Sequence, residues 1–264
     1  MTRLEFDAYL DHIRRDSARF GEVLATCDPA ASVPACPEWD AADLLWHLTG
    51  VQWFWSRIVQ GAADPEAVQE RERPAAYADL LDLYAECSAA LIDALALADP
   101  AGPAWTWSQE QTVGFIFRRQ AHEALIHRLD AEQTAGDVTD LDAQLAADGV
   151  QETLDVMFGG TPAWGTFTPG EQVLRVDCID TDDHVWVRLG VFAGTDPGSG
   201  TTYADEADIS VIDDPGGEPD CLISGPAAAL DAWLWRRAGD DEIDVTGDRT
   251  VYDAFRAIVD QPIN

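Results

Sequence analysis

The sequence predicts an α+β protein of two domains, in which a four-helix bundle precedes a small α+β domain with a mainly antiparallel sheet. Three observations support this prediction. Up to about residue 158, apolar residues recur near the period of amphipathic helices. From residue 173 onward, short runs alternate apolar with polar residues and are rich in β-branched side chains, as strands are. Between these regions, residues 159–172 contain the glycines and prolines of a loop, so we expect domains at 1–158 and 159–264.

The N-terminal region contains four long helical patterns and a shorter one. The second begins at Asp40, whose side chain is a suitable N-cap, and ends near Gly61. The third follows Pro74, and the fourth is closed by Gly136, a residue type that commonly ends helices. The expected helices cover residues 4–24, 41–60, 75–98, 113–132 and 141–158. Four long amphipathic helices in succession predict an up-and-down bundle or a close relative of one.

The C-terminal region changes from helical to strand-like patterns. Strands are expected at residues 173–180, 184–192, 207–212, 221–224 and 243–247, and helices at 226–239 and 251–259. The glycine-rich stretch GSGTT at 198–202 lacks the lysine of a phosphate-binding loop and is expected to be a turn. Strands and helices in this proportion are typical of a small α+β domain.

The charge of the chain excludes several classes of function. The formal net charge is −33, and all 16 basic residues are arginines. Such a chain lacks the basic face that neutralises nucleic-acid phosphates, and an anionic membrane would repel it. Without lysine, Schiff-base catalysis through a lysine side chain is impossible. Adaptation to high salt, or a genome that replaces lysine with arginine, accounts for this composition.

The expected compartment is the cytoplasm, and a monomer is favoured. The N-terminal stretch has acids where a signal peptide has an apolar run, and no apolar run is long enough to span a membrane. The five cysteines are odd in number and form no C-x-x-C pair, which indicates reduced thiols. Cys36 lies between prolines in PACPEWD, so a reactive thiol at this position is the alternative to a buried one.

The stretch RRQAHEALIHRLDAE at 118–132 contains a candidate metal-binding pair. Glu123 and His127 are four residues apart, so their side chains lie on the same face of a helix. His122 and His127 are one residue too far apart for the His-x3-His spacing of zinc proteases. The alternative for Glu123 and His127 is an ordinary pair on the helix surface.

A third ligand is expected from the second helix. His47 lies in the apolar stretch DLLWHLTG, which favours an inward position, although a buried histidine bonded to a backbone carbonyl is the alternative. His47, Glu123 and His127 would supply two imidazoles and a carboxylate with one position open, a set that suits Zn²⁺ or another divalent ion. Asp130 is a candidate acceptor for the second N–H of His127, and Asp43 for that of His47.

The remaining histidines, His12 and His184, are expected to lie outside this group.

Three segments resemble a known family. Residues 33–50 and 118–132 resemble the two signature blocks of mycothiol-dependent maleylpyruvate isomerases and their DinB-like relatives, and residues 224–248 resemble the sterol-carrier-type second domain of that family. The resemblance implies a DinB-like bundle with His47, Glu123 and His127 as zinc ligands.

The resemblance also implies an active-site arginine in the second domain. Arg237 is its best match, with Arg236 as an ambiguous neighbour. Glu38 stands where the family commonly has glycine, and an arginine that the family contributes from its first domain has no clear match.

The reaction implied by the resemblance is addition of a zinc-bound thiolate, from mycothiol or another low-molecular-weight thiol, to an electrophilic small molecule. With maleylpyruvate or a similar compound, addition followed by elimination would give cis–trans isomerisation. A thiol S-transferase and a non-catalytic, metal-containing binding protein are the alternatives. The expected partners are therefore a small electrophile and a thiol, with neither nucleic acid nor membrane.

Overall fold

The computed structural model describes residues 3–261 and 263, and the chain divides into two compact units. The N-terminal unit comprises Leu4–Leu141, and the C-terminal unit begins at Asp142. The first is helical and the second combines a sheet with helices, so the predicted two-domain α+β class is confirmed. No helix among the described residues is long and apolar enough to cross a membrane.

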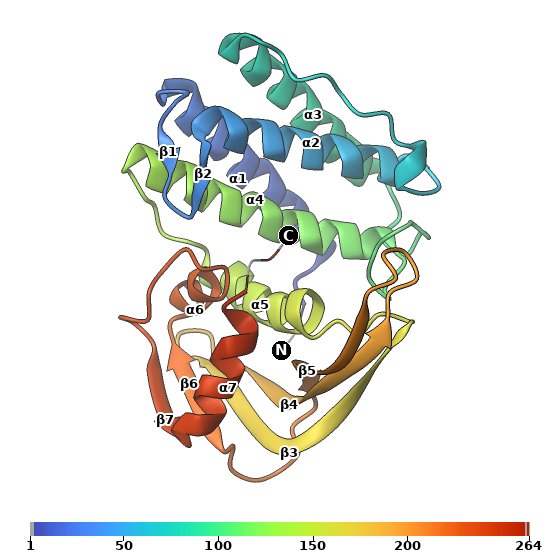
Figure 1. Cartoon of the computed structure of the whole chain (residues 1–264). Coiled ribbons are helices and arrows are strands. Elements are labelled where there is room, and N and C mark those ends of the chain that lie inside the picture. The colour runs from blue at the N-terminus through green and yellow to red at the C-terminus, as the bar shows by residue number, and fades with distance from the viewer. Residues whose placement is uncertain (1–2, 262, 264) are drawn as a thin grey trace. The chain divides into compact units, whose positions relative to one another are not determined.

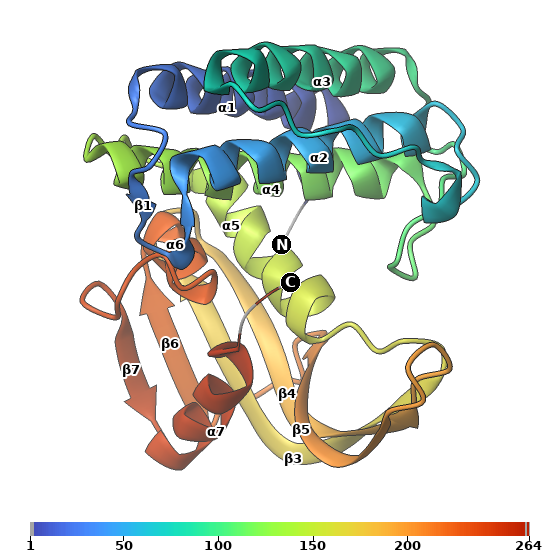
Figure 2. The same cartoon turned by 45° about the horizontal axis from the view of Figure 1, so that its top comes forward.

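The N-terminal unit is a bundle of four long helices that lie side by side (Figures 1 and 2). Around the bundle their order is α1, α4, α2, α3, and each packs against two neighbours. A two-stranded hairpin precedes α2, and a single 3-10 turn, η1, follows it. The elements are α1 (Phe6–Thr26), β1 (Ser32–Val33), β2 (Cys36–Asp40), α2 (Ala41–Val59), η1 (Pro65–Ala67), α3 (Tyr77–Leu97) and α4 (Val113–Ala135).

Local capping fixes the ends of α2 and α4. The Asp40 side chain accepts the Asp43 N–H at 2.8 Å, and the Asp43 side chain accepts the Asp40 N–H, which completes a capping box. At the start of α4, Thr112 caps the helix, and at its end Gly136 adopts a φ of 76°. Such a left-handed residue is readily supplied by glycine, so the predicted stop signal acts as expected.

One apolar cluster of the bundle core joins all four long helices. Leu44, Leu45 and Leu48 of α2 are fully buried against residues of α1, α3 and α4. The other buried members of this cluster include Phe20, Val23, Leu24, Leu80, Tyr84 and Ala131. Burial of large aliphatic side chains stabilises the bundle by about 1.5–3 kcal/mol each, and it holds α2 and α4 in a fixed register.

The C-terminal unit contains a five-stranded sheet in the order β5-β4-β3-β6-β7. All neighbours are antiparallel except β3 and β6, which confirms a mainly antiparallel sheet. Its elements are α5 (Ala143–Glu152), the π-helical turn η2 (Thr153–Phe158), β3 (Gly165–Cys178), β4 (Asp183–Thr195), β5 (Thr202–Ile212), β6 (Cys221–Gly225), α6 (Ala227–Leu234), β7 (Asp244–Gly247) and α7 (Arg249–Val259).

One face of this sheet forms the core of the C-terminal unit. Leu174 pairs with Val187 and with Cys221, and Val176 pairs with Val185, so these side chains share a face. Buried residues of α5, α6 and α7 belong to the same apolar cluster. The helices therefore cover the apolar face of the sheet, as the alternation in its strands requires.

The expected domain boundary after residue 158 differs from the division that the structure shows. Helix α5 lies in the C-terminal unit, because Ala146, Ala147, Val150 and Leu154 are buried in the cluster that includes the sheet. The period at 141–158 predicts this helical segment, but periodicity does not reveal against which unit a helix packs.

Three further boundaries differ, and one of them is the start of β5, which lies at Thr202 rather than at residue 207. Strand β3 starts at Gly165, inside the expected loop, and its register shifts between Pro169 and Val173, where an irregularity admits the Gly and Pro of this stretch. Helix α6 ends at Leu234 rather than near residue 239.

Candidate metal centre

Helices α2 and α4 bring the side chains of His47, Glu123 and His127 together. One ligand atom from each of the three lies within 4.8 Å of the other two. The Glu123 Oε1 atom lies 3.1 Å from His127 Nε2 and 3.6 Å from His47 Nε2. The two imidazole rings meet edge to face, with centroids 4.8 Å apart. All three side chains belong to the N-terminal unit.

Glu123 is oriented by two sets of partners. Its Oε2 atom accepts a hydrogen bond from Arg119, one turn earlier on α4, at 3.0 Å. This contact turns Oε1 towards the two histidines. Burial opposes ionisation of Glu123, but hydrogen bonds from His127 and His47, together with the charge of Arg119, hold its pKa well below its ordinary value. The group is therefore a carboxylate at neutral pH, as metal binding requires.

His127 is held from its other side by Asp130. The His127 Nδ1 atom lies 2.9 Å from Asp130 Oδ2, and Asp130 is fully buried. Burial alone would lower the pKa of His127, but the carboxylates of Asp130 and Glu123 raise it to about 9. Without a metal, the ring thus bridges two carboxylates as an imidazolium. Because the Nδ1–H group donates a hydrogen bond to Asp130, Nε2 is the atom that would lose its proton and bind an ion.

The donor set fits a divalent metal ion. In tetrahedral zinc sites with nitrogen and oxygen ligands, the ligand atoms are about 3.3 Å apart. The two separations from Glu123, 3.1 and 3.6 Å, lie on either side of that value, and the two histidine ligand atoms lie within 4.8 Å of each other. The exposed fraction of the side chains rises from 9% at His127 to 18% at Glu123 and 35% at His47. The cluster is thus closed towards the core and accessible beside His47, which suits a site that keeps one position for a ligand.

The structure corrects the expected role of Asp43. Instead of supporting His47, Asp43 closes the capping box with Asp40 and accepts a hydrogen bond from Arg73 at 2.7 Å. Arg73 also lowers the pKa of Asp43. The ring that contacts His47 is that of Trp39, at a centroid distance of 4.9 Å.

The other histidines lie outside the cluster, in agreement with expectation. His122 is buried and packs against the ring of Tyr9 at a centroid distance of 6.3 Å. His12 is on α1, near Asp16, and His184 is exposed on β4.

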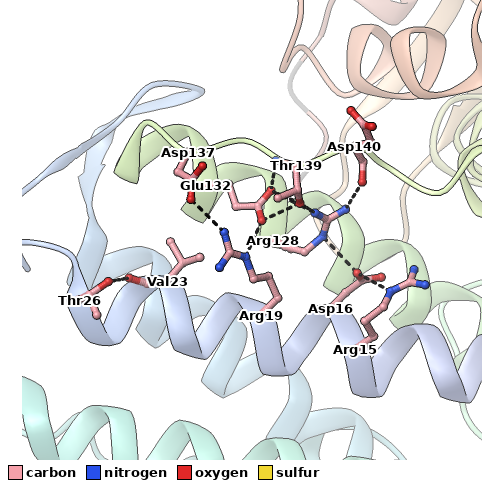
Figure 3. Close-up of polar contacts among 10 residues, drawn as sticks. All are labelled: Arg15, Asp16, Arg19, Val23, Thr26, Arg128, Glu132, Asp137, Thr139 and Asp140. Atoms are coloured by element: carbon pink, nitrogen blue, oxygen red, sulfur yellow. Dashed lines mark hydrogen bonds and ion pairs between the residues drawn. The ribbon is translucent and has the colours of Figure 1, made fainter.

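A buried ionic network holds α4 against α1 (Figure 3). The Arg128 guanidinium lies 3.1 Å from Asp16 of α1 and 3.0 Å from Glu132. Arg19 of α1 donates to Glu132 at 2.8 Å, and the Thr139 N–H donates to the same carboxylate. Buried charges are tolerated only when they are paired and hydrogen-bonded, so this network has few alternative arrangements. It fixes the helix that carries two of the three candidate ligands.

Arg237 lies in the C-terminal unit, directly after α6. The helix ends at Leu234, and Arg236 adopts a φ of 61°, which is uncommon for a residue other than glycine. The Arg237 guanidinium donates to the Trp235 carbonyl at 2.7 Å, whereas that of Arg236 lies 3.8 Å from Asp260. The role of Arg237 at an active site stays a prediction.

Arg119 and Trp39 were missed as parts of the site. Arg119 stands four residues before Glu123, so the same i,i+4 rule that paired Glu123 with His127 identifies it. Trp39 lies on β2, and its contact with His47 follows from a hairpin whose polar, proline-containing sequence gave no strand signal.

Comparisons with known proteins give matches for both units. A sequence model described as the mycothiol maleylpyruvate isomerase N-terminal domain matches residues 10–132, and the C-terminal domain model of the same enzyme matches residues 144–254. The crystal structure of the mycothiol-dependent maleylpyruvate isomerase is 15% identical, with a TM-score of 0.59; 93% of this chain and 96% of that chain are covered. The structure of a histidine-to-alanine mutant of that protein gives the same identity and coverage and a TM-score of 0.57. Curated proteins gave no match.

Proposed function

The chain belongs to the mycothiol-dependent maleylpyruvate isomerase family, and from this premise we propose that it is an enzyme that uses a metal ion and a low-molecular-weight thiol on a small electrophilic substrate. The observation that carries the proposal is the convergence of two imidazoles and one carboxylate on a shared, partly accessible point. His47, Glu123 and His127 would hold the ion, which we expect to be Zn²⁺. When bound, such an ion lowers the pKa of a thiol at its open position and keeps it as thiolate.

The residues around the ligands have supporting roles in this proposal. Asp130 sets the tautomer of His127, and Arg119 fixes the rotamer of Glu123. Arg237 would bind a substrate carboxylate through two parallel hydrogen bonds, a geometry that lysine does not reproduce.

The proposed reaction begins with attack of the thiolate sulfur on an electron-poor C=C bond. A C–S bond forms, and the π electron pair moves to the conjugated carbonyl oxygen. Rotation about the new single bond, followed by elimination of the thiolate, restores the C=C bond with trans geometry. If the adduct takes up a proton and keeps its C–S bond, the adduct is the product and the enzyme acts as an S-transferase. Mycothiol is the family thiol, and another low-molecular-weight thiol would serve the same chemistry.

The metal assignment is tested by elemental analysis after reconstitution with zinc. We expect about one ion per chain, and a steep loss of affinity in His47→Ala, Glu123→Ala and His127→Ala. His122→Ala is the matched control, because it removes a buried histidine from the same helix at a site that faces Tyr9. A wild-type protein without metal would refute the assignment. Chelation should abolish turnover while the helical circular dichroism persists; unfolding on chelation would instead favour a structural metal.

The reaction is tested with maleylpyruvate in the presence and absence of mycothiol. Full recovery of the thiol indicates isomerisation, whereas consumption of one thiol per substrate indicates transfer. Arg237→Ala should reduce kcat/KM more than Arg237→Lys does. Turnover without added thiol, or its loss in Cys36→Ser, would show that the nucleophile belongs to the protein and would refute the thiol-dependent mechanism.

A further inference from the structure

Helix α2 has a half-buried face beside the one that enters the bundle core. Together with residues 62–76, which we call the strap, this face encloses a cavity of about 760 Å³. That volume lies within the range of small-molecule binding pockets. His47 lines the cavity, so one candidate metal ligand forms part of its wall. The cavity walls are formed mainly by Trp39, Trp46, Val51, Trp53, Phe54 and Val68.

Specific contacts hold the strap over α2. The Trp53 indole N–H donates to the Gln69 carbonyl at 2.9 Å. The Trp53 ring is contacted by the guanidinium groups of Arg57 and Arg71, whose carbon atoms lie 4.4 and 4.7 Å from its centroid. Arg71 in turn donates to Glu86 of α3 at 2.8 Å. Because these contacts fix the strap against α2 and α3, the cavity is a defined part of the N-terminal unit.

Gly50 leaves the floor of the cavity open. It lies in the interior of α2, where glycine is less favourable than alanine. A Cβ atom at this position would meet nothing within 4 Å, so close packing does not require the glycine. Gly50 also lines the cavity. What the missing side chain provides is space next to His47, one turn away on the same helix face.

The chemistry of the walls selects a class of ligand. Indole and phenyl rings favour flat apolar groups, which they bind by stacking. Arg71 is the one arginine among the lining residues that the structure describes, and Glu86 already neutralises it. Glu70 adds negative charge to the wall, whereas Asp43 is paired with Arg73 at 2.7 Å. A carboxylate placed here would face Glu70 and no uncompensated arginine among the lining residues, whereas an uncharged aromatic group meets no such repulsion.

We propose that this cavity binds the electrophilic substrate, and that the part of the substrate seated in it is a flat, uncharged aromatic or conjugated group. This inference rests on the proposed function for its chemistry. It makes the preferred acceptor bulkier than maleylpyruvate, with its reactive C=C bond held at the His47 end of the cavity.

Binding is tested with N-phenyl-1-naphthylamine, a neutral aromatic probe that fluoresces in apolar pockets. We expect the wild type to bind it and the affinity to fall progressively in Gly50→Ala and Gly50→Leu, by at least tenfold in the second. Val68→Trp fills the cavity from the strap and should also lower the affinity for the probe. It replaces Gly50→Leu as the test variant if Gly50→Leu folds poorly. Ala18→Leu, an exposed change on α1, is the control and should bind like the wild type. Metal content should be equal in all four variants.

Competition decides what occupies the cavity. Excess maleate and mycothiol should leave the probe bound, whereas benzylideneacetone, a neutral aromatic enone, should displace it. Displacement by maleate or by mycothiol, or undiminished probe binding in both Gly50→Leu and Val68→Trp, would overturn the inference.

Turnover separates this inference from the proposed function. With mycothiol present, kcat/KM should be at least tenfold higher for the Z isomer of benzylideneacetone than for maleylpyruvate, and Gly50→Leu should raise KM for this enone more than it lowers kcat. Preference for maleylpyruvate in the wild type and in Gly50→Leu alike would overturn the cavity assignment while the proposed function stands. Displacement of the probe by the enone without turnover of either electrophile would refute the proposed function instead.

Discussion

Asp130→Asn isolates the contribution of the carboxylate that supports His127. Asparagine has the size of aspartate and still accepts a hydrogen bond from Nδ1, but its neutral oxygen makes the opposite nitrogen a weaker ligand. The contact is short, at 2.9 Å, and Asp130 is fully buried, so water does not replace it. Loss of such an outer partner typically reduces metal affinity by about 10–100-fold. This range corresponds to about 1.4–2.8 kcal/mol of binding free energy.

The assay is zinc competition against a chromophoric chelator at fixed ionic strength, on protein whose circular dichroism matches the wild type. Asp137→Asn is the matched control. It makes the same change of charge in a chain of net charge −33, but the Asp137 side chain is 83% exposed and contacts Arg19. The control should bind zinc within about twofold of the wild type, since exposed charges are largely screened. Equal affinities of the two variants would refute the argument that Asp130 acts through His127.

Three further predictions concern stability, measured by urea unfolding. Burial opposes ionisation of Glu132, but hydrogen bonds that include the one from Arg19 outweigh it and lower the pKa of Glu132. Its contribution to stability is therefore present above its unfolded pKa of about 4.3 and is lost as the pH falls through the lower folded value. Glu132→Gln should cost about 1.5–3 kcal/mol at pH 7, because it weakens the charge-assisted hydrogen bonds from Arg19 and Arg128, which then keep only Asp137 and Asp16 as carboxylate partners, and this cost should shrink below about pH 4. A cost that does not change with pH would contradict the assignment. Gly149→Ala should cost about 1–3 kcal/mol, because the new Cβ atom would lie 2.9 Å from both carboxylate oxygens of buried Asp231. Gly50→Ala should instead stabilise the protein by about 0.4–1 kcal/mol, since the new Cβ atom would have no atom within 4 Å to clash with. A change of stability of the same sign in Gly149→Ala and Gly50→Ala would disprove the packing argument.

Much of the fold could be predicted because local rules determine it. The capping box at Asp40 and the left-handed Gly136 are set by neighbours in sequence, and the structure has both ends at the expected positions. The polar starts of β3 and β5 could not be predicted in the same way. Their residues pair in an extended, exposed part of the sheet, where no apolar alternation is needed.

In the candidate site, too, local rules predict some contacts and not others. The pairing of Glu123 with His127 follows from helix geometry, and so does the contact of His127 with Asp130 three residues later. The partner of Asp43 could not be deduced, because Arg73 reaches it from the strap, 30 residues along the chain. The cavity could not be deduced either, because the charged sequence of the strap has no periodicity that indicates the surface on which the strap lies.

The parallel pairing of β3 with β6 imposes an order on folding. Leu174 of β3 pairs with Val187 across a short turn. Its other partner, Cys221, pairs with it only after a loop of roughly 45 residues has closed, and closing this loop costs conformational entropy. Non-local strand pairs of this kind slow folding. During synthesis the N-terminal unit also leaves the ribosome first. His47, Glu123 and His127 can therefore come together before the last strands of the sheet have been added.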